Sequence, residues 1–221
     1  MRGLFRFLLP LGLGALLLAG CCANNVCDCR DELADAFYFR FDTSGRPGSF
    51  VPRTELDTVL LKRFALPLDA KGQPFLRKGS TVQTFTGYAD SLDKAGGFDL
   101  ATIVRATAVR RDTIALNNNL PFAQSGSRKL NTYLYRIEVR DASRGPRQSV
   151  KNNPLRYELK NIALKGEFYG TGCCTCYRNT SKTATFVQLP APGQLFPRDT
   201  VITATESLHS NTPVYTTITK K

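Results

Sequence analysis

The chain has 221 residues, of which 42% are hydrophobic and 22% charged, and its formal net charge is +12. This balance excludes a wholly disordered chain, and the length suffices for one domain with a sizeable core or for two small ones. There are 14 Phe and 8 Tyr but no Trp and a single His, and together with many Thr and Val they favour β-strands over helices.

The first twenty residues predict a secretion signal. Arg2 and Arg6 supply a positive start, and residues 7–18 form an apolar run that is too short to span a membrane comfortably. Pro10 and two nearby glycines disfavour a buried core helix. We therefore expect residues 1–20 to be a cleaved signal peptide.

The end of this segment is more specific. Leu18-Ala19-Gly20-Cys21 resembles the lipobox of bacterial lipoproteins. The resemblance implies lipidation of the Cys21 thiol, cleavage before Cys21 and acylation of the new amino group, because several acyl chains anchor a protein stably. Residue 22 is Cys rather than Asp, so the inner-membrane retention signal of some lipoproteins is absent. The expected location is the outer membrane, on either its periplasmic or its surface face.

Without Arg2 and Arg6 the chain has 28 basic and 18 acidic residues, a charge of about +10. An exported basic protein can contact acidic glycans, lipopolysaccharide or lipid headgroups. The basic residues are scattered, however, which favours a solvated surface. We expect the membrane as a partner through the anchor, an acidic glycan or envelope protein as a further one, and no nucleic acid, because no aromatic-interleaved basic motif is present.

Alternating apolar residues and turn signals predict a chain of strands after the cysteines. In 36–42, Phe37, Phe39 and Phe41 share one face. The clearest amphipathic strand is 132–140, with Tyr133 on its apolar face and Arg136 on the other. The remaining strands or extended segments are expected at 56–65, 80–88, 155–168, 183–189, 200–205 and 214–219. Residues 101–110 fit either a helix or a strand, and their Thr, Ile and Val content favours a strand.

These strands, without a convincing long helix, predict an all-β fold, an antiparallel β-sandwich of the immunoglobulin-like or Greek-key kind. We divide the chain into a signal peptide at 1–20, a lipidated and Cys-rich tether at 21–35, and a sandwich domain at 36–221. A second β-domain after about residue 120 has no obvious linker.

Six cysteines remain once Cys21 carries lipid, and they split into two clusters. The disulfide candidates are Cys22, Cys27, Cys29, Cys173, Cys174 and Cys176. Export places them in an oxidising compartment, where disulfides are the default. Neighbouring cysteines are poorly placed to bridge each other in an extended chain. We therefore expect bridges between the clusters, which would staple the tether to the domain, with a connectivity that sequence does not choose.

A thiolate metal site is the alternative, because Cys-x-Cys and Cys-Cys-x-Cys crowd soft ligands suited to Zn²⁺ or Cu(I). Neither cluster has the usual Cys-x2-Cys spacing, and the lone His209 lies in a polar loop. No hydrolase, phosphate-loop or metalloprotease motif is present, and nothing nominates a carboxylate pair. We predict no catalytic residue, no metal and no cofactor.

Two further sequence features are candidates for sites on the protein surface. Asp-Thr-Val, Asp-Thr-Ile and Asp-Ser-Leu triplets resemble the acceptor for O-glycosylation in some Gram-negative bacteria, which requires exposure of the hydroxyl residue. The acceptors would be Thr58, Ser91, Thr113 and Thr200. Tyr133, Tyr135 and Tyr157 form either a sugar-stacking face or half-buried strand positions.

The function expected from these features is that of a lipid-anchored cell-envelope protein. It would be a non-enzymatic structural, adhesion or binding module. A glycan- or lipopolysaccharide-binding module is one alternative, and a thiolate metal-binding or redox protein is another.

Overall fold

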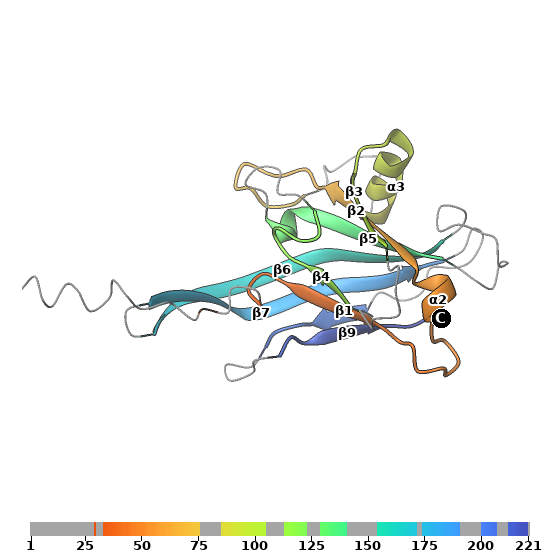
Figure 1. Cartoon of the computed structure of the whole chain (residues 1–221). Helices are drawn as coiled ribbons and strands as arrows, with labels where there is room; N and C mark the ends of the chain where they lie inside the picture. Colours follow the sequence, from red (N-terminus) through yellow and green to blue (C-terminus); the bar gives the residue numbers. More distant parts are fainter. Residues whose placement is uncertain are drawn as a thin grey trace, which may run out of the picture.

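The computed structural model describes residues 29, 33–75, 85–104, 113–122, 129–140, 154–171, 174–190, 200–206 and 212–220. The chain forms strands with few helices (Figure 1). In order, the elements are β1 (Phe37–Phe41), α2 (Pro52–Glu55), β2 (Thr58–Ala65), α3 (Phe85–Ala95), β3 (Asp99–Val104), β4 (Thr113–Leu116), the 3-10 turn η2 (Leu130–Thr132), β5 (Tyr133–Val139), β6 (Leu155–Thr171), β7 (Cys174–Leu189), β8 (Thr200–Thr203) and β9 (Tyr215–Ile218).

The strands form two packed sheets, which confirms the predicted all-β sandwich. One sheet has six strands in the order β3-β2-β5-β6-β7-β8, and every neighbouring pair in it is antiparallel. The other has the order β4-β1-β9, and here β9 runs parallel to β1. A purely antiparallel arrangement was therefore wrong for this smaller sheet. Its strands come from distant parts of the chain, so no hairpin turn fixes their direction.

The main core lies between the two sheets and is rich in aromatic rings. Phe37, Phe39 and Phe41 are all buried, as the alternation of β1 predicted. Phe39 stacks on Phe186 of β7 with ring centroids 5.5 Å apart, and Tyr157 of β6 stacks on the same ring at 5.9 Å. The Phe39–Phe186 contact joins the three-stranded sheet to the six-stranded one across the core, and Tyr157 extends the stack within the six-stranded sheet.

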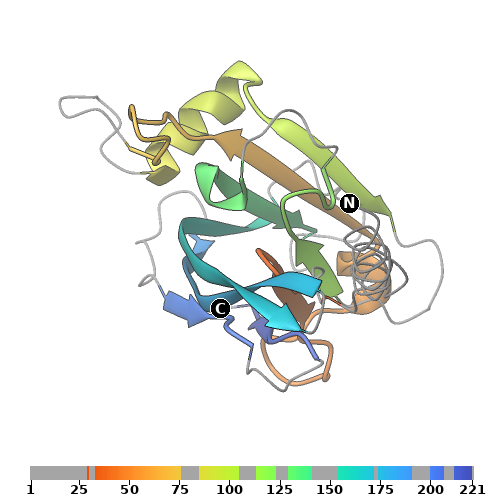
Figure 2. The same ribbon diagram turned by 90° about the vertical axis from the view of Figure 1, so that its left-hand side faces the viewer.

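Helix α3 covers the opposite face of the six-stranded sheet and makes a third layer. It lies above β2, β3 and β5 in Figure 1, and Figure 2 shows the same layer after a 90° turn of the molecule. The prediction of an extended segment through residue 88 was wrong for residues 85–88. Phe85, Tyr88, Ala89 and Leu92 recur at helical spacing, and they pack on Phe64 and Leu134 in a second, smaller core. The Thr-rich flank obscured this period.

The predicted amphipathic strand at 132–140 is present as β5, but both its apolar and its polar face are buried. It lies between β2 and β6. Its apolar face contributes to the main core, whereas its polar face lies under α3. A strand covered on both sides must satisfy any charge it carries without water, and Arg136 and Glu138 do this within the protein.

Strands β6 and β7 form a long hairpin of 17 and 16 residues. Strand β5 pairs with β6 only as far as Leu159, and β8 pairs with β7 only as far as Thr183. Residues 164–171 and 174–182 therefore pair as strands only with each other in the described part of the chain. We call this two-stranded part the distal ribbon. It projects beyond the sandwich in Figure 1.

Candidate functional site

The distal ribbon is joined to the N-terminal tether by a disulfide. Cys29 is bonded to Cys176 of β7, with Cα atoms 5.4 Å apart and a sequence separation of 147. Cys174 is disulfide-bonded as well. The Cys29–Cys176 bond confirms a covalent staple between the two cysteine clusters. The sulfurs of Cys29, Cys174 and Cys176 are thus not thiolates that a metal could take as ligands.

Hydrogen bonds extend this staple along β7. The backbone N–H of Asp35 donates to Oδ1 of Asn179 at 2.6 Å, and the Asn179 side-chain amide donates back to Oδ1 of Asp35 at 2.9 Å. The amide of Asn118 donates to the other Asp35 oxygen at 3.2 Å. Asp35 adopts a φ of 48°, a left-handed conformation that such side-chain bonds help an Asp to hold. The tether is therefore fixed at several points.

Lys182 is the most deeply buried part of this connection. Its side chain is fully buried, and its Nζ donates to the carbonyl oxygens of Leu33 and Ala36 at 2.9 and 2.8 Å. Glu206 Oε2 lies 2.6 Å from the same nitrogen. Burial lowers the pKa of Lys182, opposed by Glu206. All three ammonium hydrogens thus have acceptors, as a buried lysine requires.

One face of the distal ribbon carries two aromatic rings, one mostly exposed and the other half-buried. Phe168 and Tyr177 lie opposite each other in the register, with ring centroids 5.2 Å apart and an edge-to-face arrangement. Phe168 is 73% exposed, the highest value among the exposed large hydrophobic residues of the described chain. The Tyr177 hydroxyl lies where a Cβ at position 166 would be, so only Gly166 leaves room for it.

The other face of the ribbon carries a surface ion pair. Arg178 binds Glu167 across the strands at 2.6 Å, and the two side chains are partly exposed. The Arg178 guanidinium also lies 4.9 Å from the ring centroid of Tyr169. Lys165 is exposed nearby. The ribbon thus combines a solvent-exposed aromatic ring with cations.

A second cluster of charges lies beneath α3. Arg136 and Glu158 are both fully buried, and Nη2 of Arg136 lies 2.6 Å from Oε1 of Glu158. Two carboxylates of α3 reach the same guanidinium, Asp90 at 2.7 Å and Asp93 at 3.0 Å. Burial by itself would lower the pKa of Arg136, but the neighbouring Glu158 outweighs it and the pKa is raised. We call this cluster the ionic layer.

The ionic layer continues to β2 and to the start of α3. Lys62 Nζ bridges Asp93 at 2.9 Å and Glu138 at 3.0 Å. The Thr86 hydroxyl donates to Oε2 of Glu158 at 2.6 Å. Each of these carboxylates is held by a cation or a hydroxyl, so the arrangement fastens α3 to the sheet. It does not present an open acid and base to a substrate.

The other predicted site residues fall in various places. Cys21, Cys22, Cys27, Cys173 and His209 lie outside the described residues. Among the proposed acceptors, Ser91 on α3, Thr113 on β4 and Thr200 on β8 are exposed, whereas Thr58 on β2 is half-buried. The exposure that glycosylation requires is therefore met at three of the four positions.

The tyrosines considered for sugar stacking are buried. Tyr133 is 4% exposed, and Tyr135 and Tyr157 are each 1% exposed. They belong to the core between the sheets, and the prediction of half-buried strand positions was nearer than that of a binding face. Sequence reasoning missed Lys182 and the ionic layer, because neither residue spacing nor composition marks a charge as buried.

Comparison of the chain with family models, with curated proteins and with solved structures finds no match. Among the described residues, no helix has both the length and the apolar character needed to cross a membrane. In the same part of the chain, no group of three or more His, Cys, Asp or Glu side chains is arranged so that it could hold a metal ion. The distal ribbon with its staple is the candidate functional site.

Proposed function

We propose that the protein is a lipid-anchored, exported protein of the bacterial cell envelope. It acts as a non-enzymatic structural, adhesion or binding module. Its Cys21 carries the lipid and its sandwich domain stands in water beside the outer membrane. The lipobox-like segment supports the anchor, and the Cys29–Cys176 disulfide supports export, since such bonds persist in oxidising compartments.

That disulfide is the observation that carries the proposal. Positions 21 and 29 are eight residues apart, so the chain between them reaches at most about 28 Å when fully extended. A lipid on Cys21 therefore holds the distal ribbon close to the membrane surface. A long flexible linker would instead let the domain move freely. The staple makes the protein a closely docked module.

Membrane fractionation of the Cys21→Ala variant tests the anchor. We expect the wild-type protein in the membrane fraction and the variant in the soluble periplasmic pool, because the variant has no thiol to acylate. Cys29→Ser is the matched control, because it breaks the staple but keeps the lipid, and it stays in the membrane fraction. Unchanged membrane association of Cys21→Ala would contradict the proposal.

A further inference from the structure

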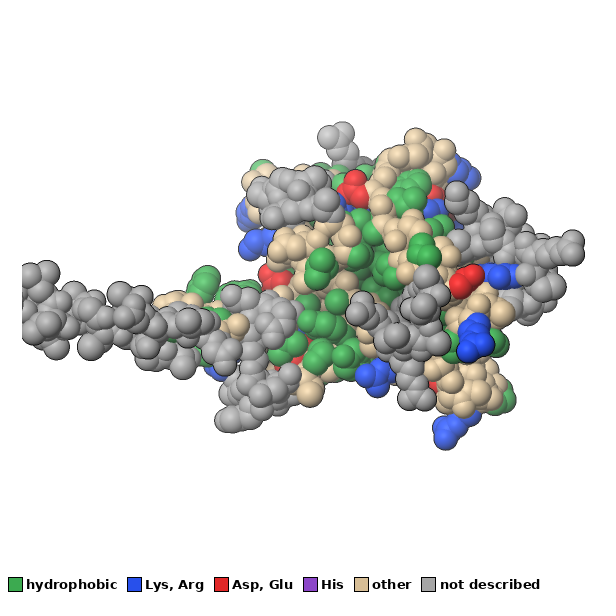
Figure 3. Space-filling view, in the orientation of Figure 1, with side chains coloured by type: hydrophobic (Ala, Val, Ile, Leu, Met, Phe, Trp, Pro, Cys, Tyr) green, Lys and Arg blue, Asp and Glu red, His purple; other side chains and the backbone are tan. Residues whose placement is uncertain are grey.

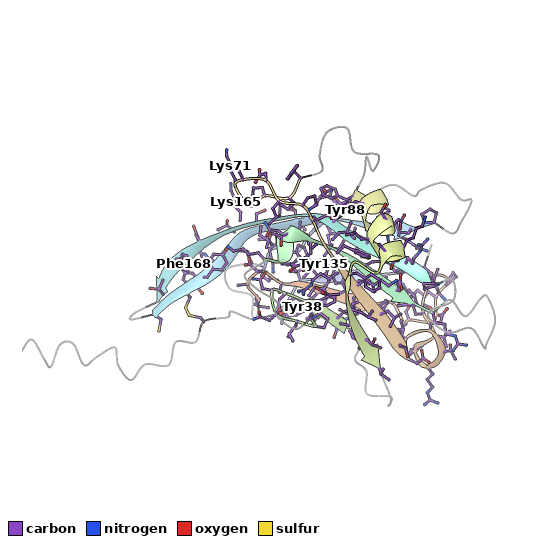
Figure 4. The ribbon with its side chains drawn as sticks, turned by 90° about the horizontal axis from the view of Figure 1, so that it is seen from above. Tyr38, Lys71, Tyr88, Tyr135, Lys165 and Phe168 are labelled. Carbon is purple, nitrogen blue, oxygen red and sulfur yellow. A yellow bond between two sulfur atoms is a disulfide. The ribbon has the colours of Figure 1, made fainter. Side chains whose placement is uncertain are left out.

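The aromatic face of the distal ribbon carries one ring that is mostly in solvent, Phe168, beside the half-buried Tyr177. Phe168 is 73% exposed and Tyr177 packs against its edge rather than covering it. Figure 3 shows hydrophobic side chains exposed along the projecting hairpin, and Figure 4 places Phe168 on that hairpin, well away from Tyr135 in the core. A single exposed phenylalanine is ordinary on a protein surface, and what sets Phe168 apart is its place on the ribbon that the disulfide joins to the tether.

The position is set by the staple. Cys176 lies opposite Tyr169 in the register, one residue from Phe168, and Cys176 is bonded to Cys29. If Cys21 carries the lipid, the eight residues from 21 to 29 confine this end of the ribbon to within about 28 Å of the bilayer surface. The two rings thus belong to the part of the protein nearest the anchor.

The chemistry of this face suits a lipid surface. Aromatic side chains settle at the boundary between acyl chains and headgroups, and tyrosine adds a hydroxyl that can stay in water. Lys165 is exposed on the same ribbon, and its charge complements lipid phosphates. Because the anchor already holds the ribbon at high effective concentration, a contact too weak to hold a free protein suffices.

We propose that Phe168 and Tyr177 rest in the headgroup region of the membrane that carries the lipid anchor. This inference rests on the proposed function and adds a second point of contact to it. Two contacts fix the orientation of the sandwich, with the ribbon toward the bilayer. A single lipid would leave the domain free to tumble about its tether.

The absence of tryptophan makes a direct test available, because Phe168→Trp introduces the sole tryptophan of the chain. The lipidated full-length variant is reconstituted into vesicles of phosphatidylethanolamine and phosphatidylglycerol, with and without brominated lipid. We expect a blue-shifted emission and strong quenching by bromine. The matched control is Val201→Trp on β8, where the wild-type side chain is 72% exposed, and its spectrum should stay water-exposed and unquenched.

Vesicle flotation in the same samples tests the lipid anchor separately from the ribbon contact. If vesicles carry the Phe168→Trp protein while its indole emission stays unquenched, the anchor holds but the ribbon contact is overturned. Protein that does not float would overturn both. Protection of the indole only after a soluble envelope protein is added would also overturn the contact and identify a protein partner instead.

A second variant measures the contact without the lipid. The soluble Cys21→Ala protein should partition weakly onto anionic vesicles, and adding Phe168→Ser should lower that partition by about tenfold. Adding Val201→Ser should leave it unchanged. Because Phe168 is mostly exposed, Phe168→Ser should fold normally, which circular dichroism checks. Equal partition of the Phe168→Ser protein and its Cys21→Ala parent would overturn the contact.

Discussion

The ionic layer and the distal ribbon contain nearly the same ion pair in opposite surroundings. Arg136 binds Glu158 at 2.6 Å and Arg178 binds Glu167 at 2.6 Å, each between neighbouring strands. The first pair is fully buried under α3, whereas the second has side chains 36% and 49% exposed. The Arg–Glu distance is the same in the two pairs, which differ in their exposure to solvent and in the two further carboxylates that reach Arg136.

Solvent decides what each pair contributes. An exposed pair contributes about 0–1 kcal/mol, because water already stabilises both charges. Removing one partner of a buried pair costs about 3–5 kcal/mol, because the other charge stays buried without compensation. We infer that the ionic layer stabilises the fold and that the charges of the distal ribbon are available for contacts outside the protein.

Arg136→Met should have the largest effect on stability. It leaves Glu158 buried without its cation, so the free energy of unfolding should fall by about 3–5 kcal/mol. Urea unfolding followed by circular dichroism measures this, with Arg178→Met as the matched control at about 1 kcal/mol or less. Similar losses in the two variants would show that burial does not set the contribution of these ion pairs. Adding Glu158→Leu to Arg136→Met should recover part of the loss.

Removal of the staple should have the next largest effect. Cys176→Ser opens a bridge that spans 147 residues, and bridges of this kind typically contribute about 2–4 kcal/mol. Amide hydrogen exchange should rise along 174–182 and remain unchanged in α3. An increase throughout α3 would show that the two regions are not independent.

Alkaline pH should distinguish a core tyrosine from a ribbon tyrosine. Burial raises the pKa of Tyr135, whereas the same side chain in the unfolded chain ionises near pH 10. Above pH 10 the unfolded state therefore binds fewer protons than the folded state, and the free energy of unfolding falls by up to about 1.4 kcal/mol per pH unit. Tyr135→Phe should make this slope shallower.

Tyr177→Phe is the control, since burial raises the pKa of Tyr177 too but its ring lies on the ribbon rather than in the core. Its effect on the alkaline slope should be smaller. A larger effect of Tyr177→Phe than of Tyr135→Phe would contradict the assignment of Tyr135 to the core.

Phe168→Ser should have the smallest effect on stability. Because the ring is mostly in water, the free energy of unfolding should change by less than about 0.5 kcal/mol. The change is measured by thermal unfolding, in detergent-free buffer, of the soluble Cys21→Ala protein with and without Phe168→Ser. A loss of several kcal/mol would show that Phe168 serves the fold rather than an external surface.

Several elements could be predicted from sequence because their pattern reports burial directly. The alternating phenylalanines of β1 and the even split of the cysteines led to a strand and a staple that the structure contains. Helix α3 was missed although Phe85, Tyr88 and Leu92 keep a helical period, because a Thr-rich flank suggested an extended chain. Once α3 is missed, the polar face of β5 looks like a solvent face.

The ionic layer could not be predicted for the same reason. Arg136, Glu158 and Asp93 come from three elements, and only the packing of α3 on the sheet brings them together. Lys182 is a similar case, since its carbonyl acceptors lie 149 and 146 residues earlier in the chain. Buried charges depend on long-range contacts that no local spacing encodes.

Peptide mapping of the membrane-extracted protein without reduction can show directly that a lipidated Cys21 segment is disulfide-linked to the distal ribbon. Trypsin should release peptide 21–30 disulfide-linked to peptide 166–178, with acyl groups on Cys21. After reduction the two peptides should separate and the acyl groups should remain on the first. An unlipidated N-terminal peptide that begins before residue 21 would contradict the lipid anchor on Cys21. Two peptides that separate without reduction would contradict the disulfide between the tether and the distal ribbon.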